Sequence, residues 1–290
     1  MPNVRANGID IEYEELGSPD DPGFLLVMGF SGQLTAWDER FCQQVADHGF
    51  RVVRYDNRDV GLSSRVTDGP TPDVMKALTG DHSTASYTIA DMADDAAALL
   101  DALDMAPAHV LGISMGGMIV QSLVTRHPDK VRSLCSIMST TGDRSVGQAS
   151  AEAIGALISP PPTNRDEAGD RSLAAWKVIG SPDFTQDEAA VRARAMAAFD
   201  RSHDPAGVAR QLVAIAASHD RTADLASVTV PTLVIHGEVD PLVDVSGGEA
   251  TAKAIPGSEL LVIPGMGHDL PPQLWTRIID TAVANAAKAA

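Results

Sequence analysis

Short apolar runs alternate with longer amphipathic segments along most of this 290-residue chain, and this alternation constrains its fold more than any other feature. Phe24-Leu-Leu-Val-Met28 is a continuous apolar run, which is typical of a strand buried on both faces of a sheet. Residues 33–48 then repeat apolar residues at helical spacing, and Gly49 ends the segment. Strands that alternate with helices in this way indicate a mostly parallel sheet with helices on both faces.

The same pattern continues toward the C-terminus. Residues 9–13 alternate apolar and polar side chains, as expected of an edge strand. Thr88 and Asp91 are spaced as a capping box, which predicts that a helix begins there. Further strands are predicted at 51–55, 109–113, 131–138, 232–235 and 260–263, with helices at 115–126 and near the C-terminus.

Residues 142–228 interrupt this alternation. They contain several Ala-rich helical stretches and no convincing strand, and Pro160-Pro161-Pro162 divides them. We therefore predict two units: an α/β core made of residues 1–141 and 229–290, and a helical cap, or lid, inserted at 142–228.

The composition limits the classes of partner. The formal net charge is −17 and the isoelectric point is about 4.7. A chain this acidic is repelled by phosphate backbones, so we expect no nucleic-acid partner. We find neither a signal-peptide core near the N-terminus nor a run of about 18 apolar residues, and therefore expect a cytoplasmic protein with no membrane partner. Cys42 and Cys135 form no CxxC pair and are expected to be buried, reduced thiols.

Gly112-Ile-Ser-Met-Gly116 is a G-x-S-x-G motif that lies between a predicted strand and a predicted helix. A serine on such a sharp strand-to-helix turn projects its hydroxyl above the sheet, and bulky residues two positions away would collide with neighbouring elements. The helix that follows offers free N–H groups to a developing oxyanion. We therefore predict that Ser114 is a nucleophile; the alternative is a structural turn with an incidental serine.

A nucleophilic serine needs a base and a residue that orients the base. His268 lies in a glycine-rich loop after the strand at 260–263, and it follows the serine in the chain order that this motif uses. The other seven histidines are assigned surface or capping positions. Asp240 follows the strand at 232–235 and is stiffened by Pro241, which makes it the predicted acid; Asp143 is the second candidate.

These motifs resemble the α/β-hydrolase superfamily over essentially the whole chain. Within it, residues 54–63, 112–117 and 265–268 are similar to actinobacterial esterases of the aclacinomycin methylesterase type. The resemblance implies about eight strands, a helical cap and an oxyanion hole formed by the backbone N–H groups of Met115 and Phe30. Many relatives have His-Gly where this chain has Met28-Gly29, so a side chain that usually braces the Phe30 loop is absent. Asp56 and Arg58 belong to a loop motif that we interpret as structural bracing.

The chain carries no HExxH motif, phosphate-binding loop or GxGxxG motif, so we expect neither a metal nor a cofactor. We predict a serine carboxylic ester hydrolase with an acyl-enzyme intermediate. Its substrates are expected to be uncharged, apolar small-molecule esters, because the cap is rich in apolar residues and the chain is acidic. Thioester, lactone or C–C bond hydrolysis, acyl transfer, and a non-catalytic ligand-binding receptor are the alternatives. The oligomeric state is left open.

Overall fold

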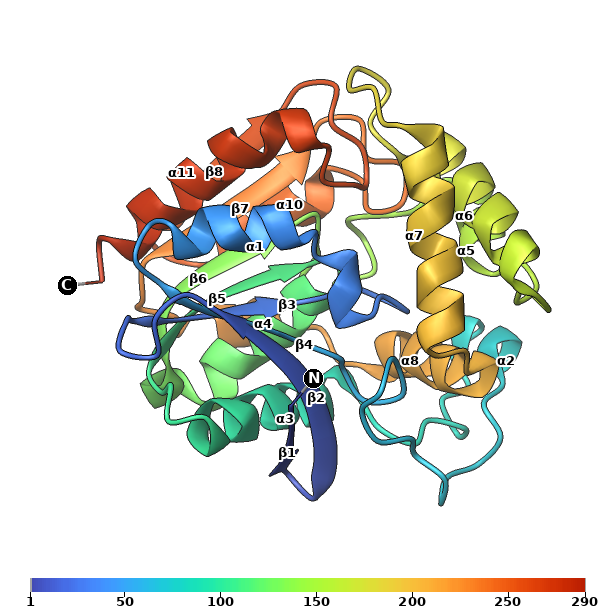
Figure 1. Ribbon diagram of the computed structural model, residues 1–290, viewed down its shortest axis with the longest axis horizontal. Helices are drawn as coiled ribbons and strands as arrows, with labels where there is room; N and C mark the ends of the chain where they lie inside the picture. The colour runs from blue at the N-terminus through green and yellow to red at the C-terminus, as the bar shows by residue number, and fades with distance from the viewer. Residues whose placement is uncertain (1, 290) are drawn as a thin grey trace.

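The computed structural model describes residues 2–289, within which eight strands form one mostly parallel sheet (Figure 1). Their order across the sheet is β1-β2-β4-β3-β5-β6-β7-β8. The pairs β1–β2 and β2–β4 are antiparallel, and every other neighbouring pair is parallel. The strands are β1 (Asn3–Ala6), β2 (Ile9–Leu16), β3 (Gly23–Val27), β4 (Arg51–Tyr55), β5 (Ala108–Ile113), β6 (Val131–Ile137), β7 (Thr232–Gly237) and β8 (Glu259–Ile263).

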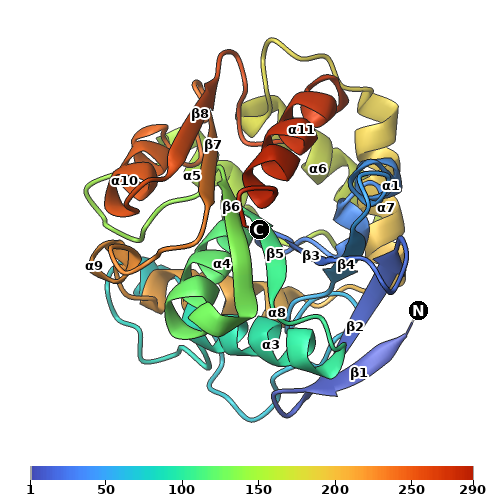
Figure 2. The same cartoon turned by 90° about the vertical axis from the view of Figure 1, so that its left-hand side faces the viewer.

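Helices cover both faces of the sheet, as the alternating pattern predicts. Figure 1 shows α1 (Glu39–Ala46) and α11 (Trp275–Ala286) on one face, and α3 (Ile89–Ala102) and α4 (Met115–Arg126) on the other. A turn of the view shows the twist of the sheet between these layers (Figure 2). A hydrophobic core lies on each face of the sheet, and alternate residues of β3 pack into one or the other. Leu25 and Val27 pack with α3 and α4, and Leu26 packs with α1 and α11.

The remaining helices belong mainly to the segment between β6 and β7. Its longer members, α5 to α8, gather beyond one end of the strands in Figure 1. A side-chain N-cap begins each of these four, because Ser150, Asn164, Asp187 and Asp204 accept hydrogen bonds from backbone N–H groups of the first turn. The other helices are α2 (Val74–Leu78), α5 (Ala151–Leu157), α6 (Arg165–Ile179), α7 (Glu188–Arg201), α8 (Pro205–Ala217), α9 (Thr222–Leu225) and α10 (Ser246–Ala254), and the last of these packs against β7 and β8.

Two predicted elements need correction. The helix predicted at 33–48 is a 3-10 turn at Leu34–Ala36 followed by α1, because Asp38 caps a new helix by accepting from Arg40 N. The predicted edge strand at 9–13 is β2, which is covered on its outer side by β1. β1 has four residues, of which only Ala6 is buried, so it carries too little apolar pattern to be predicted. The capping box of Thr88 and Asp91 is confirmed.

Both cysteines are buried and free, as predicted. Burial raises the pKa of the Cys42 thiol to about 11, which keeps it protonated near neutral pH. No helix within residues 2–289 combines the length and the apolar character needed to span a membrane.

The loop after β4 holds α7 and α8, two of the helices inserted between β6 and β7, through buried ion pairs. Asp56 accepts hydrogen bonds from Leu34 N and Leu62 N, and its carboxylate lies 2.8 Å from Arg201 at the end of α7. Asp59 pairs with Arg210 of α8 at 2.8 Å. Both carboxylates are fully buried, so each depends on its guanidinium partner for compensation.

A neighbouring residue of the same loop has a different partner. Arg58 donates two hydrogen bonds of 2.6 Å to the Asp95 carboxylate on α3, and its guanidinium lies over the Tyr87 ring. These contacts agree with the structural role that the sequence assigned to Asp56 and Arg58.

Replacing Arg210 by Met should destabilise the protein strongly, because Asp59 would remain buried without its cation. We expect a loss of about 3–5 kcal/mol in the free energy of unfolding, measured by urea denaturation. The matched control is Arg165→Met, which breaks an exposed pair with Asp200 and should cost less than about 1 kcal/mol. Equal effects of the two substitutions would show that the buried pair does not anchor α8.

Candidate active site

Ser114 occupies the turn between β5 and α4. Its backbone angles are φ 53° and ψ −121°, a conformation that non-glycine residues rarely adopt. The turn is held on both sides, because Ser114 N donates to Ile137 O at 2.9 Å and Ser139 Oγ donates to Ser114 O at 2.8 Å. The serine side chain thereby projects from the carboxyl end of β5, next to the first turn of α4.

The glycines of the motif are required by close packing. A Cβ atom on Gly112 would lie 2.1 Å from the carbonyl oxygen of Gly116, and one on Gly116 would lie 2.1 Å from that of Val27 in β3. Both contacts involve backbone atoms, which cannot move aside as a flexible side chain can. The sequence argument that bulky residues at these positions would collide with neighbouring elements therefore holds in the structure.

Ser114, His268 and Asp240 lie in one hydrogen-bonded chain. Ser114 Oγ is 2.9 Å from His268 Nε2, and His268 Nδ1 is 2.7 Å from Asp240 Oδ2. The serine follows β5, the aspartate follows β7 and the histidine follows β8. Three separate loops at the carboxyl edge of the sheet therefore bring together the three residues that were singled out from the sequence.

The hydrogen bonds of Asp240 determine which histidine nitrogen carries the proton. Asp240 Oδ1 accepts from Leu242 N and Val243 N, both at 2.9 Å, which leaves Oδ2 for the imidazole. An ionised carboxylate can only accept, so His268 Nδ1 must donate. Nε2 is then unprotonated in the neutral ring and can accept a proton from Ser114.

The competing candidates lie outside this hydrogen-bonded chain. Asp143 accepts hydrogen bonds from the backbone N–H and the hydroxyl of Ser145, and these bonds lower the pKa of its carboxyl group. His109 and His236 are buried, which corrects the surface or capping positions assigned to them. His109 contacts Ser133, and burial lowers its pKa to about 4. His236 lies beneath Asp240, and burial lowers its pKa.

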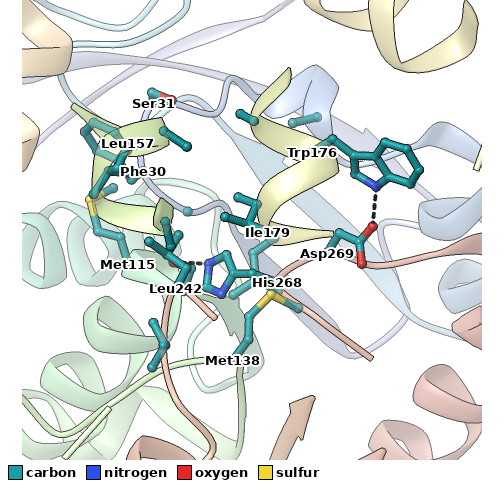
Figure 3. Close-up of a pocket in the computed structure, with 18 of the residues that line it drawn as sticks. Phe30, Ser31, Met115, Met138, Leu157, Trp176, Ile179, Leu242, His268 and Asp269 are labelled. Atoms are coloured by element: carbon teal, nitrogen blue, oxygen red, sulfur yellow. Dashed lines mark hydrogen bonds between the residues drawn. The ribbon is translucent and has the colours of Figure 1, made fainter. Parts of the chain in front are cut away.

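The two predicted oxyanion donors belong to segments beside the serine. Met115 begins α4, and Phe30 follows a turn at Gly29 that packs closely against Ser114. A Cβ atom on Gly29 would lie 3.2 Å from the Cβ of Ser114. Both Met115 and Phe30 line the cavity that contains Ser114 and His268 (Figure 3).

This cavity has a volume of about 850 Å³. Its floor comes from residues at or just after the carboxyl ends of sheet strands, including Met28, Ile113 and Met138. Its walls come largely from the inserted helices, among them Leu157, Trp176, Ile179 and Leu212. The catalytic candidates therefore lie between the sheet edge and the segment at 142–228. Within residues 2–289, no group of three or more His, Cys, Asp or Glu side chains is arranged to hold a metal ion.

Two polar contacts at this site were not predicted from the sequence. Gln211 of α8 accepts from Ser31 N at 2.9 Å and donates to Arg58 O, so it ties the Phe30 loop to the loop after β4. Asp269, next to His268, binds the inserted segment through its carboxylate. Nothing in the helical pattern around Gln211 distinguishes it from its neighbours. For Asp269, the one sequence signal was its position next to His268.

Comparison with known proteins places the chain in a family. A family model described as the alpha/beta hydrolase fold matches residues 22–272. Rhodomycin D methylesterases from Streptomyces sp. (strain C5) and Streptomyces peucetius are each 28% identical to the chain, and the match covers 92% of this chain and 92% of each relative. The crystal structure of the enol-lactonase from Burkholderia xenovorans LB400 superposes with a TM-score of 0.77 at 23% identity, covering 99% of this chain and all of that one.

Replacing Asp240 by Asn tests the assignment of the histidine proton. The amide can still accept from Leu242 N and Val243 N, but its NH₂ group would then face His268 Nδ1 and force the proton onto Nε2. We expect the rate at which a fluorophosphonate probe labels Ser114 to fall at least about 10³-fold. Asp143→Asn is the matched control and should leave this rate within about threefold of wild type. A mild Asp240→Asn effect with a severe Asp143→Asn effect would mean that the acid has been misassigned.

Proposed function

The chain belongs to the α/β-hydrolase fold family, and on that premise we propose that it is a serine carboxylic ester hydrolase with Ser114, His268 and Asp240 as its catalytic triad. The observation that carries the proposal is the hydrogen-bonded chain of these residues in an apolar cavity. A serine hydroxyl bonded to the unprotonated nitrogen of an oriented imidazole is the arrangement that acyl transfer requires.

In the proposed acylation step, His268 Nε2 takes the proton of Ser114 as Oγ attacks the ester carbonyl carbon. The negative charge that develops on the carbonyl oxygen is stabilised by the N–H groups of Met115 and Phe30. His268 then gives its proton to the leaving alcohol as the C–O bond breaks, which leaves an acyl-enzyme. Asp240 keeps the imidazole oriented and stabilises the imidazolium while it exists.

Deacylation repeats these steps with water as the nucleophile. His268 removes a proton from water, the hydroxide oxygen attacks the acyl carbon, and the same two N–H groups stabilise the second oxyanion. The proton returns from His268 to Ser114 Oγ as the acid is released. The residues of this chain thereby supply every proton transfer that the hydrolysis needs.

We further propose that residues 142–228 act as a cap over a core formed by residues 1–141 and 229–290. The apolar side chains that α5, α6 and α8 contribute to the cavity support this division. They also favour uncharged, apolar small-molecule esters as substrates, because a charged body would lose its hydration against such walls without full compensation. The net charge of −17 acts in the same direction by repelling anionic substrates.

Ser114→Ala tests the nucleophile. Removing one oxygen from the turn should leave the fold intact and reduce ester turnover to less than about a hundredth of wild type, since loss of a triad nucleophile usually costs far more than that. A fluorophosphonate probe should label the wild-type protein and leave the variant unlabelled. A folded Ser114→Ala protein with more activity than this would exclude Ser114 as the nucleophile, and an unlabelled, inactive wild-type protein would favour a binding role.

A matched panel tests the substrate class. For one apolar acyl group, kcat/KM should be higher for the neutral oxygen ester than for an analogue that carries two negative charges, with the difference largest at low salt. The same panel should include the corresponding thioester and lactone. Faster turnover of the dianionic ester would contradict the preference for uncharged substrates, and preference for the thioester or lactone would replace ester hydrolysis as the main activity.

A further inference from the structure

The loop that carries His268 is held by the inserted segment as well as by the sheet. His268 N donates to Ile179 O, at the end of α6, with a distance of 2.7 Å. Gly267 N donates to Ser181 Oγ at 2.9 Å. The backbone on which the imidazole is mounted is therefore bound to residues 179–181, which lie between β6 and β7 in the chain.

Asp269 is the centre of this contact. Its Oδ2 accepts from Trp176 Nε1 at 2.8 Å, as Figure 3 shows, and also from Gln186 Nε2. Its Oδ1 accepts from Ser181 N at 3.1 Å and from the Ser181 hydroxyl. An ionised carboxylate offers about four acceptor positions, and four donors of the inserted segment occupy them.

Close backbone packing accompanies these hydrogen bonds. A Cβ atom on Gly267 would lie 2.5 Å from Gly180 O and 2.7 Å from Ile179 O. A Cβ atom on Gly180 would lie 2.4 Å from Trp176 Nε1. The two glycines let the chains approach until the indole and Ser181 reach the Asp269 carboxylate.

We propose that Asp269 is a positioning residue for His268: it fixes the histidine loop on the inserted segment at 176–186, so that Nε2 stays within reach of Ser114. The proposal rests on the proposed function, because it assigns Asp269 a role in setting the geometry of that triad. Asp240 and Ser114 each hold the imidazole through one hydrogen bond to a ring nitrogen, and neither bond fixes the backbone of the loop that carries the ring. Asp269 restrains the backbone of this loop by bonding it to Trp176 and Ser181. The position of the catalytic base therefore depends on the position of α6.

The test is Asp269→Asn, which keeps the shape of the side chain but places an NH₂ group against donors. Misplacement of a catalytic group by about 1 Å can cost about 10²-fold in rate. We therefore expect kcat and the rate of fluorophosphonate labelling of Ser114 each to fall between about 10- and 100-fold, with KM within about threefold of wild type. A change confined to KM, or no change in labelling by this small probe, would overturn the proposal.

A double-mutant cycle with Trp176→Phe separates positioning from a loss of stability. Trp176→Phe removes one donor to the carboxylate without altering the histidine loop, and it should slow labelling severalfold. Because both substitutions act on one contact, their effects on the logarithm of the labelling rate should be clearly less than additive, whereas full additivity would argue against a shared contact. If Asp269→Asn does not fold, Ser181→Ala decides, because it removes a donor to Asp269 and the acceptor of Gly267 N at a residue outside the cavity lining: slower labelling supports the proposal and wild-type labelling overturns it.

Asp280→Asn supplies the matched control, because it removes the same charge from an exposed position on α11 and should leave both rates unchanged. Failure of this proposal is distinct from failure of the proposed function. The function fails if the wild-type protein is not labelled at Ser114 and turns over no ester. The positioning role fails if wild-type protein is labelled and Asp269→Asn is labelled equally fast.

Discussion

The backbone of Ser114 is the constraint on which the rest of the site depends. A serine at φ 53° is unfavourable on its own, and it persists because the surrounding structure determines it from several sides. Ile137 of β6 holds its amide group and Ser139, just beyond β6, holds its carbonyl group, while Gly112 and Gly116 let α4 pack closely on β5 and β3. Once that turn is fixed, the hydroxyl lies at the carboxyl edge of the parallel strands, where the loops after β7 and β8 begin.

Much of the fold could be predicted because its signals are local. The apolar run at 24–28 and the capping box at Thr88 report on their own neighbourhoods, and both predictions hold. Elements were missed or misplaced where the deciding contact is distant or weak. β1 has a single buried residue and exists because it pairs with β2, and the start of α1 depends on whether the Asp38 side chain caps it.

The same difference between local signals and distant contacts applies to the candidate site. Ser114, Asp240 and His268 could be located because each follows a recognisable strand, in a loop whose glycine or proline content is unusual. The residues that make the supporting contacts have no comparable signal in the sequence. Gln211 reaches Ser31 across 180 positions of sequence, and the Arg210 partner of Asp59 lies 151 positions away. These pairings are decided by how α8 packs against the loops after β3 and β4, and the periodicity of the sequence does not contain that information.

The position of the inserted segment between β6 and β7 bears on how this enzyme can diversify. β6 and β7 are parallel neighbours, and Arg221 N donates to Thr141 O at 2.9 Å, so the chain that leaves β6 and the chain that returns before α9 lie side by side. Loop-closure entropy grows slowly with length, by about 0.6 kcal/mol for each doubling, and the sheet can therefore tolerate inserts of very different size there. The limits come from three carboxylates of the core that need matching donors: those of Asp56 and Asp59, which are fully buried, and that of Asp269, which is partly buried. The segment that forms the cavity wall can therefore change in sequence and length as specificity evolves. Each new segment must still supply an arginine to Asp56, an arginine to Asp59 and neutral donors to Asp269.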